Sequence, residues 1–159
     1  MREERERLER AAMQMFVRAL RVTTGRRLYL LEQRERPDFL VEDGWGRKIG
    51  VEITHLYHNE AEARYLNGRE GENIHPLTSV EELVFALNRN LAKKAALSIG
   101  YDTFDALYLL IRVTSPDVPK SQVVLRLDEI VVPNSAFDEI WLLFYDWDHL
   151  DWNVLLQLR

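Results

Sequence analysis

The chain has 159 residues, of which 47% are hydrophobic and 30% are charged, as in a folded globular domain and unlike a disordered protein. The absence of cysteine excludes a disulfide framework, a thiolate zinc site and a cysteine nucleophile. No apolar run approaches the roughly 18 residues of a membrane span, and "MREERERLER" is too charged for a secretory signal, so we expect one cytoplasmic domain over residues 1–159 with no membrane partner.

The net charge of −5 is unevenly distributed along the chain. Residues 102–159 contain ten acids and four bases, whereas residues 18–36 contain six arginines and only two acids, Glu32 and Glu35. A basic patch on one side suffices for phosphate contact, because electrostatic interactions are screened beyond about 10 Å. The alternative, which composition alone favours, is that these arginines form an ordinary solvated face.

The first half of the chain predicts one helix followed by three strands. Apolar residues recur at helical spacing over residues 2–22, and Gly25 closes that segment. Three strand-like segments follow at 27–33, 38–43 and 48–57, and "GWG" (44–46) turns the chain between the second and the third. We interpret them as a three-stranded meander.

The second half predicts a helix, a buried strand and a C-terminal hairpin. A loop over 58–78 leads to a helix from Ser79 to about Ile99, where Ser79 and Glu82 have the spacing of a capping box. The apolar run 106–113 is typical of a strand covered on both faces. A short helix or irregular stretch (120–138) then precedes two strands around "WDHLD". The fold class is therefore α/β, with two helices covering a mixed sheet.

Two acids stand in or beside the predicted inner strands. Asp38 begins the second strand and Glu52 lies between Val51 and Ile53 in the third. A carboxylate in an apolar strand is costly unless it is paired, exposed or bound to a metal. Because hairpin pairing brings these two together, a shared Mg²⁺ or Mn²⁺ would relieve their repulsion, and such an ion can promote phosphodiester hydrolysis.

The segment "PDFLVEDGWGRKIGVEIT" (37–54) resembles the signature of the PD-(D/E)XK nuclease superfamily, which has the restriction-endonuclease-like fold. The order helix, three strands, helix, strand over residues 2–113 is also that of the family core. The resemblance implies a nuclease acting on nucleic acid, DNA in preference to RNA, with Asp38 and Glu52 as catalytic metal ligands. It further implies that the carbonyl of Ile53 completes the shell of a Mg²⁺ or Mn²⁺ ion.

The chain departs from the family pattern at one position. The motif expects a lysine two residues after Glu52, where Thr54 stands and cannot replace an ammonium group. Some family members supply this lysine from the second helix, and Lys94 falls about 30° from the centre of that helix's apolar stripe. We therefore interpret Lys94 as a relocated catalytic lysine; the alternatives are that it extends past its apolar neighbours to solvent, or that Lys48 takes the role.

Many family members add an acid from the first helix. Glu9 lies beside the apolar face of that helix and is our candidate; Glu4 and Glu35 are alternatives, and a charge run at a helix start is commonly a solvated face. The histidines His55, His58 and His75 could in principle form a zinc site, but scattered histidines are more often surface residues.

The sequence leaves several functions open. Besides an active nuclease, the chain is compatible with a nuclease-like binding or assembly module that has lost its chemistry, which Thr54 favours. It is also compatible with an unrelated α/β domain in which Asp38 caps a strand and Glu52 pairs with an arginine. Five C-terminal aromatic residues are predicted to pack the last hairpin, and any that are exposed would mark the face of a possible homodimer. These are Trp141, Phe144, Tyr145, Trp147 and Trp152.

Overall fold

The computed structural model describes residues 2–56, 79–115 and 117–159, which form an α/β fold around one six-stranded mixed sheet. The predicted loop over 58–78, with His58 and His75, lies outside these residues. None of the helices in the described ranges has the length and apolar character needed to cross a membrane. The elements are α1 (Arg2–Thr24), β1 (Leu28–Gln33), β2 (Phe39–Asp43), β3 (Lys48–Leu56), α3 (Val80–Leu97), η1 (Ser98–Gly100), β4 (Ala106–Val113), α4 (Lys120–Val124), η2 (Leu127–Glu129), β5 (Glu139–Asp146) and β6 (Asp151–Gln157).

The strands lie in sequence order, from β1 at one edge of the sheet to β6 at the other. β1, β2 and β3 pair antiparallel and confirm the predicted meander, while β5 and β6 form the predicted C-terminal hairpin. β4 pairs parallel with both β3 and β5. A parallel pair requires a long crossover connection, and α3 belongs to the crossover between β3 and β4.

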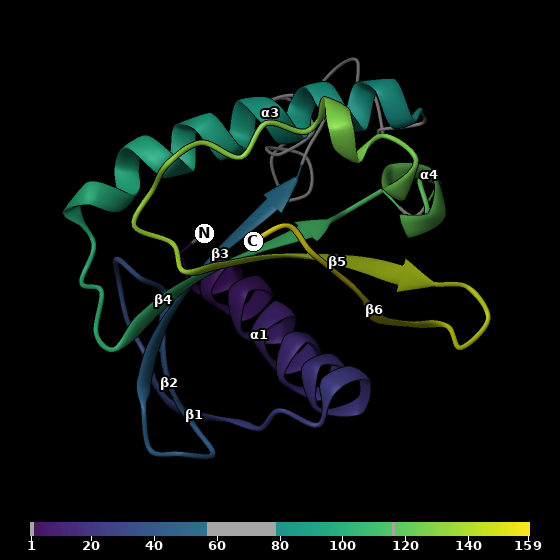
Figure 1. Cartoon of the computed structure of the whole chain (residues 1–159). Helices are drawn as coiled ribbons and strands as arrows, with labels where there is room; N and C mark the ends of the chain where they lie inside the picture. The colour runs from purple at the N-terminus through teal and green to yellow at the C-terminus, as the bar shows by residue number, and fades with distance from the viewer. Residues whose placement is uncertain (1, 57–78, 116) are drawn as a thin grey trace.

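Two helices cover opposite faces of the sheet (Figure 1). Phe16 of α1 packs on Trp141 of β5, with ring centroids 6.0 Å apart, in the core on one face. Leu87 of α3 belongs to the core on the other face. Successive residues of β4 alternate between the two cores, as Tyr108 and Leu109 do, so the prediction of a strand buried on both faces is confirmed.

Local signals in the sequence explain where the two long helices begin and end. Gly25 has a φ of +77° and its N–H donates to Arg21 O, so a residue without a side chain terminates α1. The hydroxyl of Ser79 accepts a hydrogen bond of 3.2 Å from the backbone N–H of Glu82, which confirms Ser79 as the N-cap of α3.

The position of the candidate site follows from unequal strand lengths. Pairing of β2 with β3 ends at Phe39 opposite Val51, whereas pairing of β3 with β4 continues to Leu56. Beyond Val51, the backbone N–H of Ile53 donates 2.8 Å to the side chain of Asp38 and not to another strand. The sheet is therefore open beside the second half of β3, where side chains from both covering helices can meet.

Candidate metal and phosphate site

An acidic pocket of about 340 Å³ lies at this opening in the sheet. All five residues proposed from the sequence line it. They are Glu9 of α1, Asp38 just before β2, Glu52 and Ile53 of β3, and Lys94 of α3. The residues lining it are Arg5, Glu9, Glu35, Arg36, Asp38, Glu52, Ile53, Lys94 and Tyr101.

Asp38 lies immediately before β2, where Oδ2 accepts the hydrogen bond from Ile53 N. Burial raises the pKa of Asp38 to about 8, and the negative charge of the neighbouring Glu52 carboxylate adds to the shift. The Ile53 N–H opposes the shift without cancelling it. The two acids are thus close enough to interact electrostatically, and ionisation of Asp38 is disfavoured.

Glu52 is 5% exposed and forms the floor of the pocket. Its Oε2 accepts hydrogen bonds from Lys94 Nζ at 3.0 Å and from the Tyr101 hydroxyl at 2.7 Å. Its Oε1 is buried and has no hydrogen-bond partner among the described residues. A buried, unsatisfied carboxylate oxygen costs free energy unless a proton or a cation reaches it.

Lys94 extends from α3 into the pocket and not to solvent. Its side chain is 17% exposed and forms an ion pair with Glu52, so the helical-face prediction of its direction is confirmed. The alternative lysine, Lys48, pairs instead with Glu42 and does not line the pocket. Thr54 accepts a hydrogen bond of 3.2 Å from Asn90 Nδ2. The ammonium group next to the acidic pair therefore comes from the helix.

Glu9 enters the pocket from α1, on the other side of the sheet from Lys94. It is 9% exposed, and burial raises its pKa while the guanidinium of Arg5, 3.5 Å away, partly opposes the shift. The negative charge of Glu52 also raises the pKa of Glu9, so the two carboxylates interact electrostatically. Glu35 also lines the pocket and pairs with Arg2, whereas Glu4 does not line it.

The structure pairs three of the six arginines of residues 18–36 with acidic side chains. Arg18 pairs with Asp151, Arg26 with Glu139 and Arg34 with Asp102. All three acids belong to the acidic second half of the chain, so folding neutralises much of the predicted patch. Arg36 is different, because it is exposed, lines the pocket and has no acidic partner in the described part of the chain.

Two carboxylates beside a backbone carbonyl suit Mg²⁺ or Mn²⁺. No group of three or more His, Asp or Glu side chains in the described ranges has the arrangement of a metal cluster. Mg²⁺, however, commonly binds only one or two carboxylates and keeps several waters. Oε1 of Glu52 is buried with no hydrogen-bond partner among the described residues, and Asp38 lines the same pocket, so the residues fit such an ion.

A histidine zinc site, less expected from the sequence than surface histidines, would need His58 and His75, which lie outside the described residues. His55 is largely buried, and burial together with the nearby charge of Arg112 lowers its pKa to about 4. His149 pairs with Asp146 in the β5–β6 turn. The C-terminal aromatic residues do pack the hairpin, with Tyr145 edge-on to Trp147 and Trp152, although Trp147 is 60% exposed.

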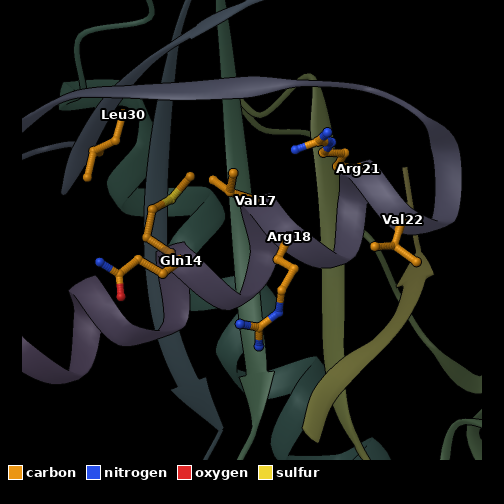
Figure 2. A pocket seen from close by; sticks show the side chains of 7 residues that line it. Gln14, Val17, Arg18, Arg21, Val22 and Leu30 are labelled. Carbon is orange, nitrogen blue, oxygen red and sulfur yellow. The ribbon is translucent and has the colours of Figure 1, made fainter.

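A second, larger pocket of about 620 Å³ lies between α1 and β1. Figure 2 shows Val17, Arg18, Arg21 and Val22 on α1, with Leu30 on β1 above them. None of the described residues that line it is acidic, so it has no carboxylate for a cation.

Two residues of the acidic pocket escaped the sequence reasoning. Tyr101 stands seven residues after Lys94, a spacing that places both on one side of α3 and its 3₁₀ extension, so helical periodicity carried a usable signal. Arg5 gave none, because it is one of several charges in "MREERERLER". The chain matches no protein-family model, no curated protein and no solved structure.

Proposed function

We propose that the chain is a metal-dependent nuclease that hydrolyses phosphodiester bonds in nucleic acid. The observation that carries the proposal is the convergence of Asp38, Glu52 and Lys94 in one pocket, with Lys94 Nζ 3.0 Å from Glu52 Oε2. The order helix, three strands, helix, strand supports the resemblance to the PD-(D/E)XK superfamily, which implies that core.

Each residue has a role that its position allows. Asp38, Glu52 and the carbonyl of Ile53 would hold Mg²⁺ or Mn²⁺, which polarises a phosphodiester and lowers the pKa of an attacking water. Lys94 places a positive charge beside the acids, where it can orient water and stabilise negative charge on the phosphate. Glu9 can accept the proton that the water loses.

The reaction consumes one water for each bond cleaved. The water oxygen attacks phosphorus, one ester P–O bond breaks, and the products are a phosphomonoester and a hydroxyl group. Arg36 and Arg5 at the pocket wall can bind the phosphate oxygens. The pocket therefore combines carboxylates that can bind the cation with positively charged side chains that can bind the substrate phosphate.

The test is cleavage of plasmid DNA, single-stranded DNA and RNA with Mg²⁺ or Mn²⁺. Asp38→Asn and Glu52→Gln should each reduce cleavage at least about 100-fold, because each removes a charged ligand oxygen from the site. Glu42→Gln, a change on β2 outside the pocket, is the matched control and should leave the rate unchanged. Cleavage that persists in chelator, or in both pocket variants, would contradict the proposal.

A second candidate is a nuclease-like module that binds nucleic acid or assembles with a partner without cleaving. One observation favours it: Thr54 stands where the family motif has a lysine. Binding of an oligonucleotide by the wild type with no cleavage under any metal condition would select this candidate.

A further inference from the structure

Tyr101 lines the acidic pocket and is fixed by two contacts, one of its ring and one of its hydroxyl. It follows η1 directly, and its ring packs edge-on against Phe137, with centroids 6.4 Å apart and an interplanar angle of 82°. Its hydroxyl donates 2.7 Å to Glu52 Oε2, and burial followed by this hydrogen bond raises the pKa of Tyr101. The phenol therefore remains a neutral hydrogen-bond donor across the physiological pH range.

The two donors to Glu52 converge on the same oxygen. A carboxylate oxygen has two lone pairs, and Oε2 uses both, one for Lys94 and one for Tyr101. Oε1 is left buried without a hydrogen bond from any described residue. Lys94 alone would not enforce this arrangement, because an ammonium group attracts both oxygens of a carboxylate as a point charge. The directional hydrogen bond from the Tyr101 hydroxyl, whose ring packs on Phe137, distinguishes the two oxygens.

We propose that Tyr101 is a positioning residue that orients Glu52, so that Oε1 is the oxygen presented to the cation beside Asp38. This inference rests on the proposed function, since it assumes that the pocket binds Mg²⁺ or Mn²⁺. Tyr101 acts through Glu52 and contacts neither the cation nor the substrate. Groups that orient metal ligands in this way change metal affinity about 10- to 100-fold when they are removed.

Tyr101→Phe removes the hydroxyl and keeps the ring that packs on Phe137. Tyr108→Phe is the matched control, because the hydroxyl of Tyr108 also bonds to a charged side chain, Arg26, but Tyr108 does not line the pocket. A purely structural role would lower the melting temperature in both variants and leave metal affinity unchanged. A positioning role lowers metal affinity in Tyr101→Phe alone.

The experiment is titration of each protein with Mn²⁺, following free Mn²⁺ by electron paramagnetic resonance and recording melting curves in chelator alongside. We expect Tyr101→Phe to raise the Mn²⁺ dissociation constant about 10- to 100-fold and Tyr108→Phe to leave it at the wild-type value. Equal affinity in wild type and Tyr101→Phe would overturn the role of Tyr101 while the proposed function stands. No Mn²⁺ binding by the wild type would overturn the metal site itself, and the inference with it.

Discussion

Lys94 of α3 and Glu52 of β3 form an ion pair at 3.0 Å whose two side chains are 17% and 7% exposed. An ion pair this far from water gains little net stability, but removing one partner leaves a buried charge uncompensated. The pair therefore ties the helix to the strand at the position where the chemistry is proposed.

Lys94→Met should lower the free energy of unfolding by about 2–4 kcal/mol, because the buried Glu52 carboxylate loses its positive partner and one of its two hydrogen bonds. Lys93→Met is the matched control on the exposed side of the same helix and should change stability by less than about 0.5 kcal/mol. Urea denaturation checks both values. Combining Lys94→Met with Glu52→Gln should restore most of the loss; equal effects of Lys93→Met and Lys94→Met would contradict the role of the ion pair.

Asp38→Asn should stabilise the metal-free protein at alkaline pH. The folded pKa of Asp38, about 8, lies above its ordinary value of 3.8, so the folded state holds a proton that the unfolded chain releases. The contribution of Asp38 to stability is therefore full below about pH 4 and is lost as pH rises to about 8. Asparagine imitates the neutral form and removes this loss.

Melting curves in chelator at about pH 5 and about pH 8 test this expectation, with the difference between Asp38→Asn and wild type growing at the higher pH. Each kcal/mol corresponds to about 2–4 °C in a chain of this size. Asp128→Asn, a change of the same kind at an exposed position, is the control and should show no such growth. A difference that stays constant between the two pH values would show that Asp38 ionises normally.

Gly50→Ala should disturb the site without touching a pocket residue. A Cβ at Gly50 would lie 2.6 Å from Pro37 Cγ and 3.1 Å from side-chain atoms of Leu107 and Phe104. Because the proline ring is rigid, we expect Pro37 to move and Asp38 with it. The overpacking should cost about 1–3 kcal/mol of stability.

Mn²⁺ affinity and urea denaturation of Gly50→Ala should both show a loss. Gly100→Ala is the matched control, because a Cβ there meets no atom within 4 Å and its backbone has no positive φ. We expect Gly100→Ala to behave as wild type in both measurements. Wild-type affinity in Gly50→Ala would show that the contact with Pro37 does not position Asp38.

Arg36→Gln should weaken binding of a single-stranded oligonucleotide and reduce its salt dependence. Arg36 lines the pocket with no acidic partner among the described residues, so its charge is available to a phosphate. Loss of one phosphate contact should lower the slope of log affinity against log salt by about 0.7. Arg18→Gln, at a guanidinium already bound to Asp151, should leave the slope unchanged, and a larger effect of Arg18→Gln than of Arg36→Gln would contradict this assignment.

Most of the fold could be predicted from the sequence because its signals are local. Gly25 ends α1 and Ser79 begins α3 through contacts within a few residues of each. The continuous apolar run of β4 indicates a strand buried on both faces, whichever strands pair with it. The proximity of Asp38 and Glu52 could also be predicted, because a short turn joins β2 to β3 and brings the two positions together.

The sequence by itself determined the order of the elements, the two acids and the helical face that carries Lys94, because periodicity and short turns act over neighbouring residues. Only the tertiary structure decided that Arg18 is neutralised by Asp151, 133 positions away, and that Tyr101 bonds to the same oxygen as Lys94. Such contacts depend on the register of the strands. They also depend on where the pairing of β2 with β3 ends, because the sheet is open beyond that point and Glu9 and Lys94 reach the pocket from opposite faces. Register is a collective property of the packed sheet, and no single segment encodes it.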